Sequence, residues 1–153
     1  MTVIADERIR VAAPRERIWP VFDDADRLRA ALPGCETLEA IAPGEYRGVL
    51  ATRLPFLTLR ADVTARLADV ARPDSLRLEL EGRPRGLAGG FRASIPISLD
   101  DAGSATDVRY VLDLTTSGRL ATFGTPLLRD TFRKQVATLV ANLDQMLAGE
   151  PTT

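Results

Sequence analysis

The sequence predicts an α+β fold in which a curved antiparallel sheet of about seven strands wraps around one long C-terminal helix. Three observations predict it. Apolar and polar residues alternate with a period of two from Cys35 to Leu114, a helical period returns after Gly118, and two short helical segments follow the first strand. The chain has 153 residues, of which 45% are hydrophobic and 27% charged. This is ordinary for one globular domain, so we expect residues 1–153 to form a single domain.

The N-terminal elements follow from local signals. A first strand over residues 3–11 would place on one face Val3, Ala5, Glu7, Ile9 and Val11. Pro14 then opens a short helix, which Pro20 should weaken or kink. Asp23 or Asp24 can cap a second short helix, which the Pro-Gly pair at 33–34 ends.

The middle of the chain reads as a meander of strands with one apolar and one polar face. The clearest alternating runs lie at residues 59–67, 76–80, 91–99 and 108–114, and turn signals separate them at residues 43–44, 72–74, 86–90 and 100–104. Pro96 falls on the polar face of its run, which indicates an edge strand or a bulge.

The C-terminal segment predicts one amphipathic helix over residues 119–148, roughly 45 Å long at 1.5 Å per residue, with a kink at Pro126. It is the element best suited to cover the apolar face of the sheet. Inward residues at several strand positions are small, notably Ala61, Ala65 and Ala93, with Gly48 beside Tyr46. Small wall residues favour a cavity between helix and sheet, and the alternative is a packed core with ordinary voids.

Composition excludes several kinds of chemistry. The chain has no histidine, which removes the commonest general base and imidazole metal ligands. The single Cys35 can form no internal disulfide and has no adjacent His or Lys to activate it, so we expect a small buried side chain. A net charge of −1 gives no overall attraction to nucleic acid. We find no transmembrane span or signal peptide, no metal site and no tightly bound cofactor, and we expect a cytoplasmic protein.

Several motifs resemble one known family, and the resemblance covers about residues 3–147. They are Ala13-Pro14, Ile18-Trp19, Leu32-Pro33-Gly34-Cys35, Leu38-Glu39, Tyr46, the Gly86 to Gly90 turn, Gly118-Arg119-Leu120-Ala121 and Phe123-Gly124. In this order they resemble the G-subunit family of carbon monoxide dehydrogenase. The resemblance implies the helix-grip fold of the START-like (SRPBCC, birch-allergen-like) superfamily. It also implies a role beside molybdenum hydroxylases of the carbon monoxide dehydrogenase type, in membrane recruitment of the enzyme and in carrying a lipophilic quinone.

The candidate site is the lining of the expected cavity. Its proposed residues are Tyr46, Phe56, Leu87, Phe91, Tyr110, Phe123 and Leu127. Either tyrosine could offer its hydroxyl to a ligand carbonyl, or could bond the backbone instead. Glu7 shares the inward face and could act as a ligand hook, but we expect it to reach water at a strand end. Arg119 could guard the mouth or be solvated.

Two loops each allow more than one interpretation. The apolar turn at residues 54–57, Leu-Pro-Phe-Leu, is either a lip at the cavity mouth that touches a membrane or partner, or local core over the end of the helix. The glycine-rich stretch Gly86 to Gly90 lacks the context of a phosphate loop and predicts a mobile hairpin turn.

The sequence therefore predicts a non-enzymatic carrier of a hydrophobic ligand, such as a menaquinone- or ubiquinone-type molecule or a lipid. We expect it to lie in the cytoplasm, with peripheral contact to the inner face of the plasma membrane. A pure protein-interaction adaptor with an incidental cavity is the first alternative. A cyclase- or lyase-type enzyme, which would have to use Glu7, a tyrosine or an aspartate, is the second.

Overall fold

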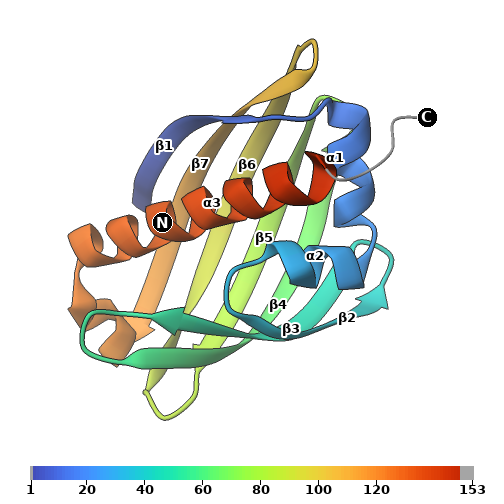
Figure 1. Ribbon diagram of the computed structural model, residues 1–153. Helices are drawn as coiled ribbons and strands as arrows, with labels where there is room; N and C mark the ends of the chain where they lie inside the picture. The colour runs from blue at the N-terminus through green and yellow to red at the C-terminus, as the bar shows by residue number, and fades with distance from the viewer. Residues whose placement is uncertain (1, 149–153) are drawn as a thin grey trace.

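A computed structural model describes residues 2–148, and residues 1 and 149–153 of the predicted domain lie outside the described part. One antiparallel sheet runs the length of the molecule in the order β1-β7-β6-β5-β4-β3-β2 (Figure 1). Its strands are β1 (Thr2–Val11), β2 (Cys35–Ala42), β3 (Glu45–Arg53), β4 (Thr58–Ala71), β5 (Ser75–Pro84), β6 (Gly89–Ala102) and β7 (Ala105–Gly118).

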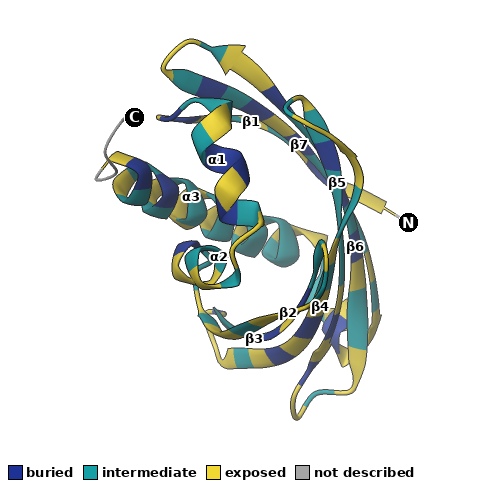
Figure 2. Cartoon of the chain, turned by 90° about the vertical axis from the view of Figure 1, so that its right-hand side faces the viewer, coloured by how far each residue is buried: buried dark blue, intermediate teal, exposed yellow. Residues whose placement is uncertain are grey.

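The helices gather on the concave side of this sheet. They are α1 (Arg15–Phe22), α2 (Ala25–Ala31), the 3₁₀ helix η1 (Arg119–Phe123) and α3 (Thr125–Ala148). Seen from the side, the sheet curls around α3 while α1 and α2 fill the gap at one end (Figure 2). The predicted α+β fold, a seven-stranded sheet wrapped around a C-terminal helix with two short helices after the first strand, is confirmed.

The short helices begin and end where the sequence places them. The Asp24 carboxylate caps α2 by accepting from the backbone N–H groups of Asp26 and Arg27, at 3.0 and 3.2 Å. After α2, Gly34 adopts a φ of +73°, and a Cβ there would lie 2.0 Å from the carbonyl oxygen of Ala51. Only glycine fits this crossing between the helix end and β3. Pro20 lies inside α1, as predicted.

The predicted inward face of the first strand is wrong at its start. A register shift between Val3 and Ala5 inserts a bulge, which leaves Val3 58% exposed and buries Ile4 instead. Because side chains alternate along a strand, one extra residue moves the preceding side chain to the other face. The alternation holds from Ala5 to Val11.

Pro96 does not lie on an edge strand. Its strand β6 pairs with β5 on one side and β7 on the other, and Pro96 stands opposite Arg77 of β5. On the β7 side the pairing skips Ile95 and Pro96 and resumes in the same register. Proline has no N–H to donate, so the central sheet accommodates it by an interruption of one ladder rather than by a bulge.

The C-terminal helix is shorter than predicted. Residues 119–123 form η1, and Gly124, with a φ of +84°, ends the helical conformation there. The helix α3 begins at Thr125 and spans 24 residues. Pro126 therefore lies in the first turn of α3, where its missing N–H needs no partner, and does not kink a longer helix.

Candidate ligand site between α3 and the sheet

The core under α3 has two unequal halves. One half, beside α1 and the C-terminal end of α3, is closely packed. Its fully buried members include Val21, Leu99 and Leu147. This half holds eleven of the buried residues of the core, against six in the other half.

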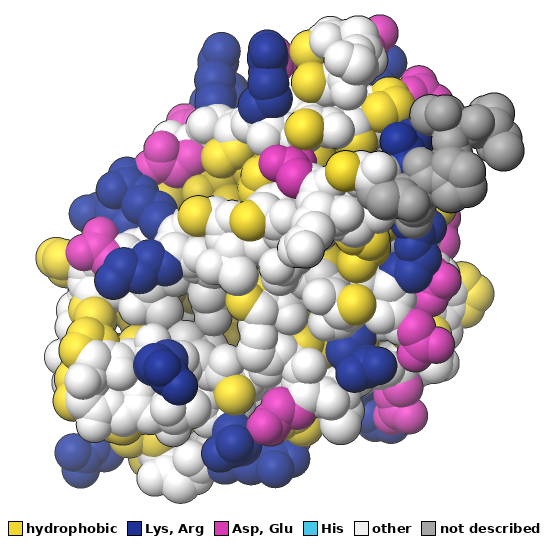
Figure 3. Space-filling model, viewed as in Figure 1, with side chains coloured by type: hydrophobic (Ala, Val, Ile, Leu, Met, Phe, Trp, Pro, Cys, Tyr) yellow, Lys and Arg dark blue, Asp and Glu magenta, His cyan; other side chains and the backbone are white. Residues whose placement is uncertain are grey.

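The other half, toward the N-terminal end of α3, is loosely covered. Leu78 and Leu80 lie on the concave face of β5, the central strand, yet both keep part of their surface exposed. Phe132 and Val136 face them from α3 and are also only partly buried. Solvent therefore reaches the middle of the sheet beneath the helix, and the surface is visibly hollowed between α3 and β3 (Figure 3).

Polar bonds hold α3 over this half along both of its sides. On the β1 side the Arg129 Nε donates to the Ile4 carbonyl at 2.5 Å, and Arg133 pairs with Glu7. On the opposite side the Gln135 side-chain amide donates to the Thr52 hydroxyl at 2.9 Å, which ties α3 to the end of β3. Neither residue of this last pair is among the predicted site residues, and no local signal indicates the contact because the two lie far apart in the chain.

The other end of α3 is tied to the helical cap. The Asn142 amide donates to the Ala31 carbonyl of α2 at 2.9 Å, and the Asp144 carboxylate accepts from the Ala12 backbone N–H at 2.8 Å. At the closed end, side chains of α3 therefore bond to the backbone of neighbouring segments. At the open end, two of the three contacts described join one side chain to another.

Four of the seven predicted lining residues lie at the open end of the molecule, and two of them are in contact. The rings of Phe56 and Phe123 pack edge to face, 5.5 Å apart at 78°. The hairpin that carries Leu87 lies against the start of η1, where the Arg119 N–H donates to the Ala88 carbonyl. Leu127 follows in the first turn of α3 and is half-buried. The β3–β4 turn, the β5–β6 turn and η1 all lie at this end (Figure 1).

The apolar turn at residues 54–57 divides between its two interpretations. Leu54 is buried, as the local-core interpretation expects. Phe56 is 60% exposed and Leu57 37% exposed, as the lip interpretation expects. Arg53 and Arg119 flank this end and are exposed. An exposed phenylalanine and leucine at a loop tip beside arginines form a surface on which an apolar layer could rest.

Phe91 lies deeper, on the concave face. Its ring covers Gly82 of β5 so closely that a Cβ on the glycine would come within 2.2 Å of it. The ring therefore needs glycine at this position of the neighbouring strand. No sequence pattern indicates this contact between the two strands. Phe91 is partly exposed and lines the loosely covered half.

The two tyrosines differ. The Tyr46 hydroxyl donates to the Phe22 carbonyl at the end of α1, which is the backbone alternative expected from the sequence, and burial raises the pKa of this phenol. Tyr110 lies in the middle of β7, and its ring packs against Phe132 of α3 at 5.7 Å. Tyr46 therefore belongs to the closed end, while Tyr110 lies at the edge of the loosely covered half.

Glu7 and Cys35 also have definite places. Glu7 stands opposite Tyr110 in the middle of the β1–β7 pair, not at a strand end, and its carboxylate pairs with Arg133 of α3. Cys35 is half-buried, and burial raises the pKa of its thiol, with Arg29 opposing the shift. A thiol with a raised pKa is a poor nucleophile at neutral pH, in agreement with the inert role expected.

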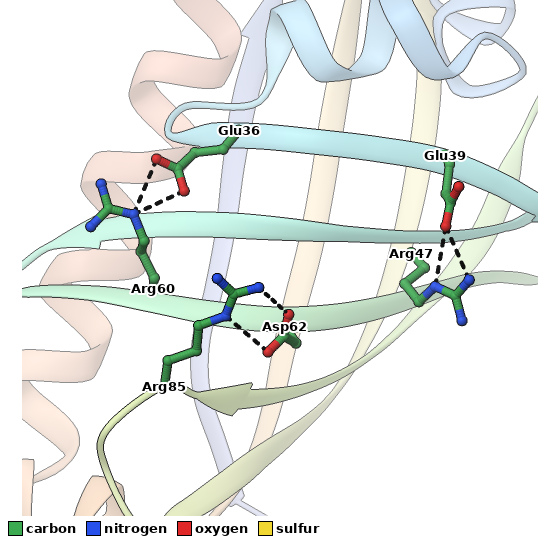
Figure 4. A network of polar contacts seen from close by, with 6 residues as sticks. All are labelled: Glu36, Glu39, Arg47, Arg60, Asp62 and Arg85. Carbon is green, nitrogen blue, oxygen red and sulfur yellow. Dashed lines mark hydrogen bonds and ion pairs between the residues drawn. The ribbon is translucent and has the colours of Figure 1, made fainter.

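The convex face of the sheet is covered by arginine–carboxylate pairs. Figure 4 shows three of them on neighbouring strands, Glu36–Arg60, Asp62–Arg85 and Glu39–Arg47, at 2.8–3.0 Å. Two open grooves of about 330 and 390 Å³ lie on this face, and none of the seven predicted residues lines them. Exposed pairs add little stability, but they keep the outer face polar.

The sequence model of the G-subunit family of carbon monoxide dehydrogenase (CoxG) matches residues 8–148. The chain belongs to this family. No curated protein sequence matches this CoxG-family chain. Within residues 2–148, no helix is both long enough and apolar enough to cross a membrane.

Solved structures share the fold of this CoxG-family chain at low sequence identity. A conserved protein from Geobacillus kaustophilus has a TM-score of 0.84 and 19% identity, over 94% of this chain and 93% of that one. A START superfamily protein from Mycobacterium smegmatis has a TM-score of 0.68 and 13% identity, over 94% and 96%. The Zhui aromatase/cyclase from Streptomyces sp. R1128 has a TM-score of 0.67 and 13% identity, over 94% and 92%. The START-like helix-grip fold is therefore shown.

Proposed function

We propose that this protein is a non-enzymatic carrier of a hydrophobic ligand, an isoprenoid quinone or another lipid, that serves a carbon monoxide dehydrogenase-type molybdenum hydroxylase. The observation that carries the proposal is the partial exposure of Leu78 and Leu80 beneath α3. Leucines at the centre of a covered sheet are normally buried, so their exposure marks space that an apolar molecule would fill.

The wall of this space is apolar and supplies few groups for chemistry. Phe91, Phe132 and Val136 surround the two leucines, and the chain has no histidine to transfer protons. Such a lining suits binding by contact area rather than catalysis. The likeness to an aromatase/cyclase supports the enzyme alternative only through a shared fold, and fold alone does not assign a reaction.

The open end supports a delivery role. Phe56, Leu57 and Phe123 form an apolar lip beside exposed Arg53 and Arg119, an arrangement suited to contact with a membrane surface or with the enzyme. The family description supports the choice of enzyme partner. We propose a cytoplasmic protein that binds peripherally to the inner face of the plasma membrane and passes its ligand through this end.

Organic extraction of the purified protein, followed by mass spectrometry, tests the ligand. Recovery of a quinone or lipid in near-stoichiometric amount is the expected result. Failure to recover one, together with failure of added menaquinone or ubiquinone analogues to bind, would overturn the carrier proposal.

A pair of variants separates the carrier from an adaptor with an incidental cavity. Ala65 is half-buried on the concave face of β4 opposite Leu80, so Ala65→Phe should fill the space. Thr64→Phe adds the same ring to the exposed convex face and is the matched control. Loss of ligand with Ala65→Phe alone supports the carrier. If both variants still capture the dehydrogenase and neither the wild type nor any variant binds ligand, the adaptor is correct.

A further inference from the structure

The Tyr110 hydroxyl is a donor without a protein partner on a buried residue. Tyr110 is only 5% exposed, and no hydrogen bond to its hydroxyl is present within residues 2–148. Tyr46, equally buried on the same face, bonds the Phe22 carbonyl instead. Hydroxyl groups of buried residues are almost always paired, so an unpaired one calls for an explanation.

Accessible surface on the hydroxyl supplies that explanation. Among the described residues, the side-chain polar atoms that are both fully enclosed and unpaired belong to Arg15 and Asp113, and the Tyr110 oxygen is not one of them. The Tyr110 oxygen therefore keeps some accessible surface, close to the partly exposed Glu7 and Arg133 side chains. An accessible donor on an otherwise buried ring is suited to a ligand rather than to the protein backbone.

The surroundings of Tyr110 fix what kind of group could pair with it. Burial raises the pKa of its phenol and the nearby Glu7 carboxylate raises it further, while Arg133 acts in the opposite direction. The hydroxyl therefore keeps its proton at neutral pH and can donate it in a hydrogen bond. What it lacks is an acceptor.

The charges beside Tyr110 favour a neutral acceptor. Glu7 and Arg133 form an ion pair with each other, so neither charge is left uncompensated there. A ligand carboxylate would meet the repulsion of Glu7 without a free cation to offset it. A carbonyl oxygen accepts the same hydrogen bond without that repulsion.

The position of Tyr110 also sets an orientation. It stands opposite Ile97 and Glu7, halfway along β7, where the closely packed half of the core ends. From there the partly exposed surfaces of Leu80 and Phe91 lead toward the open end. A molecule that reaches Tyr110 could extend along these apolar surfaces.

We propose that the Tyr110 hydroxyl donates a hydrogen bond to a carbonyl oxygen of the bound hydrophobic ligand. The carbonyl end of the ligand lies deep under α3, and its apolar remainder extends toward Phe56 and Phe123. This inference rests on the proposed carrier function and adds to it the ligand group that the protein recognises, the residue that recognises it and the direction in which the ligand binds.

Displacement of the neutral fluorescent probe N-phenyl-1-naphthylamine tests the inference. The competitors are undecan-2-one and 2-methylundec-1-ene, which have the same shape and differ in the carbonyl oxygen. The measured quantity is the ratio of their affinities, which cancels general changes in the site. Because one hydrogen bond contributes about a five- to tenfold factor, Tyr110→Phe should lower the ketone preference by that factor. Tyr46→Phe is the matched control and should leave the ratio unchanged.

The outcomes separate this inference from the proposed function. If the wild type binds neither the probe nor added menaquinone and ubiquinone analogues, and organic extraction recovers no quinone or lipid, the carrier function fails, and this inference fails with it. If the probe binds but Tyr110→Phe leaves the ratio unchanged, the ligand site stands and the role of Tyr110 is wrong. Carbonyl-¹³C-labelled ketone gives a second readout, because its resonance when bound to the wild type should lie downfield of its resonance when bound to Tyr110→Phe.

Discussion

The unequal packing of the two halves of the core predicts unequal costs for the same substitution. Leu99 and Leu80 both lie on the concave face of central strands, but Leu99 is 2% exposed in the closed half and Leu80 is partly exposed in the open half. Truncation to alanine removes three carbons from each. At about 0.8 kcal/mol per buried carbon, the transfer contribution for Leu99 is about 2.4 kcal/mol, and the cavity left behind raises the loss to about 3 kcal/mol.

For Leu80 the same truncation should cost only about 1 kcal/mol. Part of its surface already meets solvent, and the space beside it is already open, so no new closed cavity forms. At about 2–4 °C per kcal/mol for a chain of this size, the melting temperature should fall by roughly 10 °C for Leu99→Ala and by about 3 °C for Leu80→Ala.

Urea and thermal unfolding of the ligand-free protein, followed by circular dichroism, measure both losses. Leu57→Ala, at an exposed position, is the control for truncation without burial and should change stability little. Equal losses for Leu80→Ala and Leu99→Ala would refute the reasoning, because they would mean that the core beneath α3 is packed throughout.

Three further predictions concern the lip, the capped helix and the outer face. Phe56→Ser should reduce binding to anionic liposomes and lower the free energy of unfolding by less than about 1 kcal/mol, since the ring is 60% exposed. Leu54→Ser should instead unfold the buried base of the turn. A large stability loss for Phe56→Ser would contradict the interpretation of this turn as a lip. Asp24→Ala should lower the free energy of unfolding by about 1 kcal/mol in urea titrations by removing the acceptor of two helix N–H groups, and an unchanged midpoint would show that water replaces the cap. The hydrogen bond from Arg85 lowers the pKa of Asp62 from its ordinary 3.8, so this pair stabilises the fold above that pH and the contribution is lost as the pH falls through the lower folded-state value. Arg85→Gln should therefore flatten the acid limb of the stability–pH curve, and parallel curves for the variant and the wild type would contradict it.

Local signals in the sequence were sufficient for most of the fold. Alternation of apolar and polar residues located the strands, Asp24 and the Pro-Gly pair marked the limits of α2, and the helical stripe located α3. The errors arose where a single residue interrupted the alternating or helical pattern of apolar residues. The bulge at Val3 exchanged two side chains between faces, and Gly124 divided a continuous apolar stripe into η1 and α3.

The site was only partly predictable for a different reason. The sequence showed which residues are apolar and face inward, but the partner of each depends on contacts between distant segments. Nothing near Tyr46 or Tyr110 in the chain indicates that one hydroxyl meets the Phe22 carbonyl and the other meets no acceptor within residues 2–148. The Gln135–Thr52 and Arg133–Glu7 contacts that hold α3 over the sheet are equally non-local.

The sequence by itself therefore determined the class of this protein. Its period-two strands and single long amphipathic helix require a sheet that closes over a helix. Only the tertiary structure decided where that closure is incomplete. A sheet curved around one helix cannot be covered evenly, so α1 and α2 cover one end, while beneath the N-terminal half of α3 the central Leu78 and Leu80 stay partly exposed.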